Sequence, residues 1–269
     1  MVKTNAGIWQ TFQPSQAPLG AFVHEKIIEL ETAFKGLCRQ LKGVTLLFSV
    51  TQQDPDIFKK PSQSVRLNCL DYIETARVTV TDTFDNYWSK RGKNLRQNLR
   101  RQRNRLEREQ TNIALNILQN PQDVYNAIKQ YGELEAAGWK NSQGTAVSIN
   151  NAQGEFYTQL LTDYCETGNG VIYQYQYNNK LVATDLCISR NGTIIILKTT
   201  FDESIKTSSP AMLMRQDVFQ KIFEDKLYNN IEFYGKVMDW HTKWTKEIRR
   251  MYHINFYNSL LIKFLKKLK

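Results

Sequence analysis

The sequence has few of the residues that build cross-links and metal centres. Its 269 residues include four cysteines and three histidines. No two of the cysteines, Cys38, Cys69, Cys165 and Cys187, stand in a Cys-x-x-Cys arrangement. This spacing excludes a zinc signature and favours reduced, buried thiols, so we expect no metal ion.

Long apolar runs are also missing. The longest uninterrupted one, VTLLFSV at 44–50, is far too short to cross a bilayer, which takes about 20 residues. The first 20 residues contain no apolar segment of the kind that secretory signals carry. We therefore expect a soluble, cytoplasmic protein that is at most peripheral to the inner face of the membrane.

A diffuse positive charge is missing too, although the formal net charge is +10. Nine basic residues and one acid fall within 89–108, and four lysines with no acid fall within the last eleven residues. The rest of the chain is close to neutral. Two basic patches on a nearly neutral protein differ from the diffusely basic character of many nucleic-acid-binding proteins.

The chain does contain a regular succession of helices and strands. Apolar residues three and four apart predict an amphipathic helix within 20–43, and the β-branched run after it predicts a buried strand. From Thr83 onward, a basic helix is followed by further helices and by three strand candidates joined at NNK and RNG, which are good hairpin turns. A helix after Pro210, a short strand ending at Gly235, a helix near 241–251 and a last segment complete the predicted order.

Three stretches of the sequence resemble a known family. They are LEAAGWKNSQGTA at 134–146, LKTTFDESIKTSSPAMLM at 197–214 and GKVMDWHTKW at 235–244. With the order of elements, they are similar to the GNAT-type bacterial acetyltransferase-like family related to the CelD proteins of cellulose biosynthesis and to the Fem-type transferases of cell-wall assembly. The resemblance implies an α+β GNAT fold, with a mixed, largely antiparallel sheet flanked by helices. It also implies a partial N-terminal GNAT-like lobe at 1–80 and a GNAT-like acyltransferase domain at 81–269, which includes the basic helix 84–110.

The turn after the third of these strands is the candidate donor site. A helix that begins there offers backbone N–H groups and the positive end of a dipole to a phosphate. In GNAT enzymes this place holds the pyrophosphate of coenzyme A, so the resemblance implies acyl-CoA, such as acetyl-CoA, as the donor. The residues assigned to it are Lys198, Ser208, Ser209, Ala211 and Met212. The alternative is a plain helix cap.

Two positions in this stretch depart from the family pattern. The family has glycine where this chain has Ala211, and tyrosine where it has Phe201. The added methyl group of Ala211 would crowd a phosphate that approaches the backbone amides.

Asp185, Asp202 and Lys243 are the candidate catalytic residues. Asp185 lies in an otherwise apolar strand, where a carboxylate needs a partner or a water-lined cleft. It either removes a proton from the acceptor or forms a structural ion pair, with Lys198 as the suggested partner. The resemblance implies that Asp202 is the family aspartate, which orients the turn or assists proton loss. It also implies that Lys243 stabilises the anionic oxygen formed during acyl transfer.

The acceptor is expected to contact aromatic and basic side chains. Trp139 and Lys140 open a glycine-containing loop, while Tyr234 and Trp244 lie on either side of the late Lys243. A tryptophan in a loop often packs against the protein surface and has only a structural role, so a structural role for Trp139 is the alternative.

Basic residues dominate the helix 84–110. Leu95, Leu99 and Leu106 recur at helical spacing and predict a narrow apolar seam that packs on the domain. A basic face comprises Lys93, Arg96, Arg100 and Arg103. Three interpretations stay open: a solvated surface helix, a surface for an anionic ligand or substrate, and a site for the phosphates of a duplex or a tRNA. Aromatic residues interleaved for base stacking, which single-strand binders use, are absent.

Taken together, these features predict an acyltransferase. It would move an acyl group from acyl-CoA or a similar activated donor to an amine or hydroxyl, plausibly of a sugar, peptide or cell-envelope precursor, without a metal ion. One alternative is a catalytically silent GNAT-like module that binds anionic lipid or polysaccharide, which the lysine-rich LLIKFLKKLK tail favours. Another is an aminoacyl-tRNA-dependent Fem-type transferase. The oligomeric state stays open.

Overall fold

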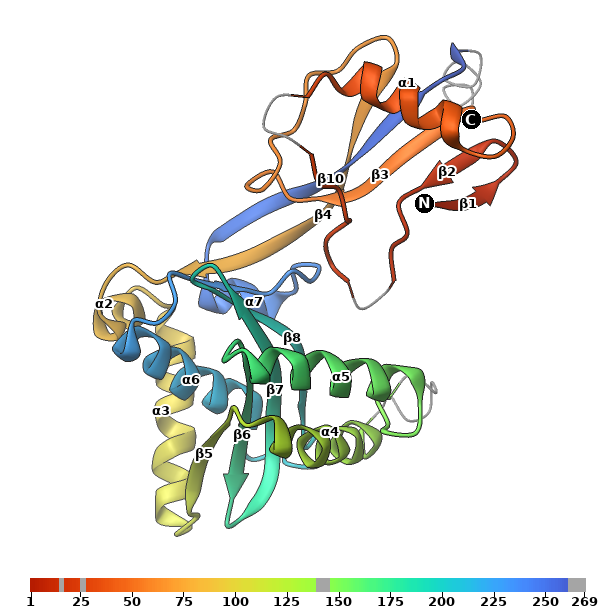
Figure 1. Cartoon of the computed structure of the whole chain (residues 1–269). Helices are drawn as coiled ribbons and strands as arrows, with labels where there is room; N and C mark the ends of the chain where they lie inside the picture. Colours follow the sequence, from red (N-terminus) through yellow and green to blue (C-terminus); the bar gives the residue numbers. More distant parts are fainter. Residues whose placement is uncertain (15–16, 25–27, 139–145, 261–269) are drawn as a thin grey trace. The chain divides into compact units, whose positions relative to one another are not determined.

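The computed structural model describes residues 1–14, 17–24, 28–138 and 146–260 (Figure 1). The chain divides into two compact units. The first comprises Met1–Ala76, Tyr234–Met238 and the chain from Glu247 onward, and the second comprises Arg77–Phe233 and Asp239–Lys246. Helices and strands occur in both, which confirms the predicted α+β class.

The first unit is a sheet with one helix. Its strands lie in the order β1 (Val2–Asn5), β2 (Ile8–Gln10), β3 (Leu47–Gln53), β10 (Glu247–Tyr257) and the first part of β4 (Leu67–Thr79). Helix α1 (Leu30–Gln40) lies within the predicted range 20–43. It begins at Leu30 because the Glu29 carboxylate caps it there by accepting hydrogen bonds from the amides of Glu31 and Thr32. Its buried residues Phe34 and Cys38 lie one turn apart and pack into the core of this unit.

Strand β10 corrects one sequence prediction. A helix was expected near 241–251, but only α7 (Asp239–Trp244) is helical, and the chain from Glu247 is a strand. Antiparallel pairing with β3, in which Ile254 faces Val50, satisfies its backbone groups and buries alternate side chains such as Tyr252 and Phe256. The strand therefore belongs to the first unit, whereas the sequence analysis placed it in the 81–269 range. The assignment of two GNAT-like lobes stays a prediction.

The second unit is a sheet covered by helices. Its strands lie in the order β9 (Asn230–Glu232), β8 (Thr193–Phe201), β7 (Lys180–Arg190), β6 (Gly170–Tyr177) and β5 (Ile113–Leu118), with the last residues of β4 at the β9 edge. Its helices are α2 (Phe84–Ser89), α3 (Lys93–Arg108), α4 (Pro121–Ala136), α5 (Ala152–Glu166), α6 (Pro210–Asp225) and α7. Strands β5 to β8 and the β4–β9 pair are antiparallel, and β8 and β9 are parallel. The predicted mixed, largely antiparallel sheet is confirmed.

Helices pack on both faces of this sheet. Leu186 of β7 lies in a buried cluster with Ile128 of α4 and Leu161 of α5, and these two helices lie side by side (Figure 1). The preceding residue, Asp185, contacts Arg215 of α6. Because neighbouring residues of a strand point to opposite faces, α6 covers the other side.

Turn chemistry joins the three central strands as predicted. Asn178 and Asn179 connect β6 and β7 with φ of 48° and 64°, and Asn191 and Gly192 connect β7 and β8 with φ of 50° and 70°. Positive φ at both central residues is what a tight two-residue hairpin needs, and asparagine and glycine tolerate it best.

The parallel β8–β9 ladder is short. It joins Thr193 to Asn230, Ile194 to Ile231 and Ile195 to Glu232, and the rest of β8 up to Phe201 has no partner on β9.

Candidate active site

A groove of about 680 Å³ lies where β8 ends and α6 begins. We call it the β8–α6 groove. Its walls are Thr199, Phe201, Glu203, Ile205, Lys206, Ser208, Ser209, Ala211, Met212, Arg215, Trp240 and Lys243, all within the second unit. The structure thus brings five of the predicted site residues together, namely Ser208, Ser209, Ala211, Met212 and Lys243.

The start of α6 forms one end of this groove. Ser209 caps the helix, with Pro210 at the first helical position, and its carbonyl oxygen accepts hydrogen bonds from the amides of Met212 and Leu213. The N–H of Ser209 donates to the Oε1 atom of buried Gln102 on α3, at 2.8 Å. The turn therefore does not present all its amides to a ligand as predicted, because α3 already occupies one of them.

Asp185 and Arg215 form a buried ion pair at the floor of the groove. The Arg215 side chain is 2% exposed and that of Asp185 is fully buried. The Nη2 atom of Arg215 donates to Asp185 Oδ1 at 3.1 Å and to Thr199 Oγ1 at 2.9 Å. Burial raises the pKa of the Asp185 carboxyl, and the guanidinium and Thr199 oppose this rise. Asp185 does not line the groove, so its role is to hold Arg215.

Arg215 also packs against aromatic side chains. Its guanidinium lies 5.5 Å from the ring centre of Phe233 and 5.4 Å from that of Trp240. Its Nη1 atom is buried and has no hydrogen-bond partner among the residues the structure describes. Arg215 therefore brings positive charge to the floor of the groove, although this nitrogen atom is itself closed to solvent.

Lys198 is neither the partner of Asp185 nor part of the groove, and both predictions for it are corrected. Its Nζ atom donates to Gln153 at 3.3 Å, lies 4.0 Å from Glu135 Oε1, and stands over the ring of Tyr157. These residues belong to α4 and α5. Thr199 faces the groove instead, because side chains alternate along β8.

Asp202 orients the turn after β8. Its Oδ2 atom accepts a 2.8 Å hydrogen bond from Lys180, and its Oδ1 atom accepts one of 3.0 Å from the Ser204 amide. Burial works to raise its pKa, but the hydrogen bonds from Lys180 and Ser204 outweigh it, and the pKa is lowered. A carboxylate with a lowered pKa is a poor proton acceptor, so the geometry favours the orienting role.

The predicted acceptor residues do not gather at the groove. Trp244 is fully buried, stacks on Trp88 at 5.9 Å between ring centres, and its carbonyl accepts from the Tyr87 hydroxyl, so it is a core residue. Tyr234 belongs to the first unit, where its ring stands 5.3 Å from the guanidinium of Arg249. Trp139 and Lys140 lie outside the described residues.

Glu203, Lys206, Arg215 and Trp240 are among the groove residues that were not predicted from the sequence. Glu203 is the one carboxylate among the groove residues that the structure describes, and Lys206 is an exposed cation beside it. Arg215 had a detectable signal, because it interrupts the apolar stripe of α6 between Ala211 and Val218 at helical spacing.

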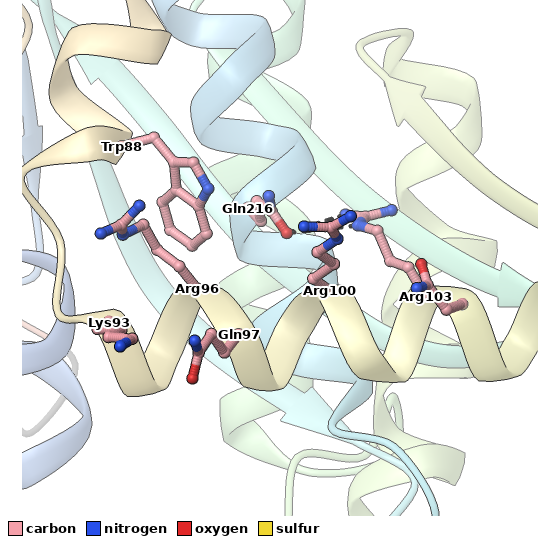
Figure 2. A pocket seen from close by; sticks show the side chains of 8 residues that line it. Trp88, Lys93, Arg96, Gln97, Arg100, Arg103 and Gln216 are labelled. Carbon is pink, nitrogen blue, oxygen red and sulfur yellow. Dashed lines mark hydrogen bonds between the residues drawn. The ribbon is translucent and has the colours of Figure 1, made fainter.

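The basic helix α3 borders a second groove of about 550 Å³, which we call the α3 groove (Figure 2). It is lined by Trp88, Lys93, Arg96, Gln97, Arg100, Arg103, Asn104 and Gln216. The predicted seam of Leu95, Leu99 and Leu106 is buried, as is Gln102. Lys93, Arg96, Arg100 and Arg103 of the predicted basic face line this groove together. Figure 2 shows the aromatic ring of Trp88 beside these cations.

All four cysteines are free, buried thiols. Within residues 1–14, 17–24, 28–138 and 146–260, no group of three or more His, Cys, Asp or Glu side chains is arranged to hold a metal ion. None of the helices in these ranges combines the length and the apolar character needed to cross a membrane.

Comparison with known proteins agrees with this architecture. Residues 93–242 match the acetyltransferase (GNAT) domain family. No curated protein matches the sequence. FemX is similar in structure, with 8% identity, a TM-score of 0.57, and coverage of 88% of this chain and 77% of that one.

Two further solved structures are similar over most of this chain. A conserved protein of unknown function from Bacteroides thetaiotaomicron has 13% identity and a TM-score of 0.56, covering 85% of this chain and 76% of its own. The C-terminal domain of a lysylphosphatidylglycerol synthetase from Agrobacterium fabrum has 12% identity and a TM-score of 0.53, covering 82% and 71%. These likenesses show a shared fold. Because the family match spans more than half of the sequence, the chain belongs to the GNAT acetyltransferase domain family.

Proposed function

We propose that this protein is an acyltransferase that takes acyl-CoA as donor and acylates an amine or hydroxyl. The observation that carries the proposal is the β8–α6 groove. It combines the start of α6 with two exposed cations, Lys206 and Lys243, and with the buried Arg215. Its volume of about 680 Å³ lies in the usual range for ligand sites.

The groove offers separate places for the parts of such a donor. Lys206, next to the start of α6, is placed to meet the pyrophosphate, since the Ser209 amide is already bonded to Gln102. Phe201, Ile205 and Met212 supply apolar surface for an acyl or pantetheine chain. Ala211 stands where the family has glycine, so in this chain we assign phosphate binding to side chains more than to amides.

The chemistry follows from the remaining groups. The acceptor nitrogen or oxygen attacks the thioester carbonyl, the carbon–sulfur bond breaks, and the thiol leaves. Lys243 is assigned to stabilise the oxyanion of the tetrahedral intermediate. Glu203 is assigned to take the proton of the acceptor, because Asp185 is paired with Arg215 and Asp202 with Lys180.

Acetyl-CoA binding tests the donor assignment. Titration calorimetry of the whole chain should show one site. Lys206→Gln should weaken binding about tenfold, the usual effect of losing one charged hydrogen bond. Lys221→Gln is the matched control. Lys221 lies on α6, pairs with Asp225 and lines neither groove. Absence of acetyl-CoA binding, or equal losses in both variants, would overturn the assignment.

Turnover tests the role of Lys243. Release of the CoA thiol, with water or a test amine as acceptor, should fall about a hundredfold in Lys243→Ala, while acetyl-CoA affinity changes little. Glu203→Gln should lower the rate most at low pH, where the acceptor is protonated. Unchanged turnover in Lys243→Ala would remove that lysine from the site.

A second candidate, transfer from aminoacyl-tRNA, is supported by Lys93, Arg96 and Arg100 of α3, which form no ion pair within the described part of the chain. In that case a tRNA should bind with a steep salt dependence, whereas acetyl-CoA bound through one or two cations should show a shallow one. A chain that binds neither donor but sediments with anionic vesicles would be the silent scaffold. The proposed acceptor is a sugar or cell-envelope precursor.

A further inference from the structure

The α3 groove is built from three elements. Helix α3 supplies Lys93, Arg96 and Arg100, the loop end of α2 supplies Trp88, and α6 supplies Gln216 (Figure 2). The three cations stand at spacings of three and four residues, so they share one face of the helix. Figure 2 shows Arg96 next to the Trp88 ring, and Arg100 and Arg103 beside Gln216.

The positive charge of this face has little internal compensation. Lys93, Arg96 and Arg100 form no ion pair with any residue in the described part of the chain, although Arg96 donates from Nε to the Arg91 carbonyl. Arg103 is different, because Asp217 and Gln216 bind it. No acidic side chain lines this groove among the described residues.

A neighbouring face of the same helix is arranged differently. It is lined by Arg101, Arg105 and Arg108 together with Glu107, and Arg105 pairs with Glu109 at 2.7 Å. That face has no aromatic residue in its lining among the described residues. It therefore provides an internal control with the same residue types on the same helix.

The uncompensated face weakens the helix that carries it. Like charges three or four residues apart destabilise a helix. Helix α3 also has no acidic residue in its first turn and no side-chain cap, so Lys93 and Arg96 stand at the positive end of its dipole. A bound dianion would reverse both effects.

Trp88 gives the groove a flat apolar wall. Its ring is half-buried and held in place by stacking on Phe84 and Trp244, each 5.9 Å away between ring centres. A fixed, partly exposed indole suits the face of a nucleobase or of a sugar ring. The amides of Gln97, Asn104 and Gln216 add donors and acceptors around it.

We propose that the α3 groove is a second binding site, for a phosphate ester that carries at least two phosphate charges and a ring, such as a nucleoside diphosphate. The phosphates lie on Arg96 and Arg100, and the ring lies on Trp88. Gln216 is one helical turn, about 6 Å, beyond Met212 of the β8–α6 groove, so such a ligand lies near the donor. Its role as the acceptor rests on the proposed function, whereas the binding site does not.

Three probes separate the chemistry: ADP or UDP, inorganic pyrophosphate, and the unphosphorylated nucleoside. Tryptophan fluorescence and calorimetry should show binding of the nucleoside diphosphate, weaker binding of pyrophosphate and none of the nucleoside. Arg96→Gln with Arg100→Gln should weaken nucleotide binding by about a hundredfold or more, since the loss of each charged contact to phosphate costs about tenfold or more. The control pair, Arg101→Gln with Arg108→Gln, removes the same charge from the other face and should change the affinity less than threefold.

Trp88→Leu tests the ring separately. It should weaken ADP or UDP binding severalfold and leave pyrophosphate binding unchanged. Farnesyl diphosphate in detergent micelles tests a lipid ligand. If it binds more tightly than ADP or UDP, the natural ligand of the groove is a lipid diphosphate and not a nucleotide.

Several results would overturn the proposal. Equal losses in both arginine pairs would mean a diffuse charge effect, and absence of binding of every phosphate probe would mean a merely solvated helix. A matching loss of acetyl-CoA affinity in Arg96→Gln with Arg100→Gln would make the groove part of the donor site. Nucleotide binding by a chain that does not bind acetyl-CoA would leave this site standing while the proposed function fails.

Discussion

Arg215 is a cation placed where the sequence pattern calls for an apolar side chain. Ionised groups inside a protein need partners, and Arg215 has Asp185, Thr199 and three aromatic rings within reach. Asp185 is the counter-charge of this guanidinium, which explains a carboxylate in an otherwise apolar strand. The pair joins β7, β8 and α6 beneath the groove.

Removing one member of this pair should destabilise the fold strongly. Arg215→Met leaves Asp185 buried without its partner, and such losses amount to about 3–5 kcal/mol. The double variant Asp185→Asn with Arg215→Met should regain much of this loss, because both charges are gone. Urea denaturation measures both values.

Arg101→Met serves as the control, because Arg101 is exposed and its replacement should stay within about 0.5 kcal/mol of wild type. If Arg215→Met lowers the free energy of unfolding by less than about 1 kcal/mol, the pair contributes little to the stability of the fold.

At the scale of elements, strand β10 is joined to the first unit by more than its ladder with β3. Arg249 of β10 donates from Nε to Asp54 Oδ1 at 2.9 Å and from Nη2 to Oδ2 at 2.6 Å. Asp54 follows directly after β3 and its side chain is 1% exposed. This bidentate contact fixes the register of β10 against β3.

The same contact predicts a pH dependence. Burial works to raise the pKa of Asp54, but the hydrogen bonds and charge of Arg249 outweigh it, and the folded-state pKa is lowered. A lowered pKa contributes stability above the unfolded-state value, about 3.9, and this contribution is lost as the pH falls through the folded-state value. Unfolding free energy should therefore decline below about pH 4 in wild type, and less steeply in Asp54→Asn.

Denaturant titrations at several pH values measure this slope. Asp163→Asn, which changes an exposed carboxylate of α5, is the control and should keep the wild-type slope. Parallel slopes in wild type and Asp54→Asn would contradict the linkage.

At the scale of the whole molecule, charge and binding surfaces are unevenly distributed. The second unit contains both grooves and the basic helix, as well as the GNAT family match apart from the short Tyr234–Met238 stretch. The net charge of +10 is therefore a local property of a few segments, which limits what it says about the protein as a whole.

Hydrogen exchange should show this division. Saturating acetyl-CoA should slow amide exchange in peptides covering 199–215 and 239–246, because only the folded groove binds the ligand. The strands of the first unit should exchange at unchanged rates. Inorganic phosphate at the same ionic strength is the control, and equal protection in both units would contradict a donor site confined to the second.

Local sequence features predicted much of this fold. The hairpins at Asn178–Asn179 and Asn191–Gly192, the seam of α3 and the turn before Pro210 depend on contacts between near neighbours, so periodicity and turn chemistry are enough to find them. The motifs around these segments led to the right family. They also placed Lys243 with the residues that begin α6.

Only the tertiary structure decided which groups share a site. Asp185 pairs with Arg215 instead of Lys198, Gln102 accepts a hydrogen bond from the Ser209 amide, and Trp244 is part of the core. Each of these contacts joins residues 30 or more positions apart, for which a single sequence carries no local signal. The sequence alone determined the family, most of the elements and the positions of the cations along the chain. Folding determined which cations meet a carboxylate and which are left for a ligand, because that depends on the faces that packing brings together.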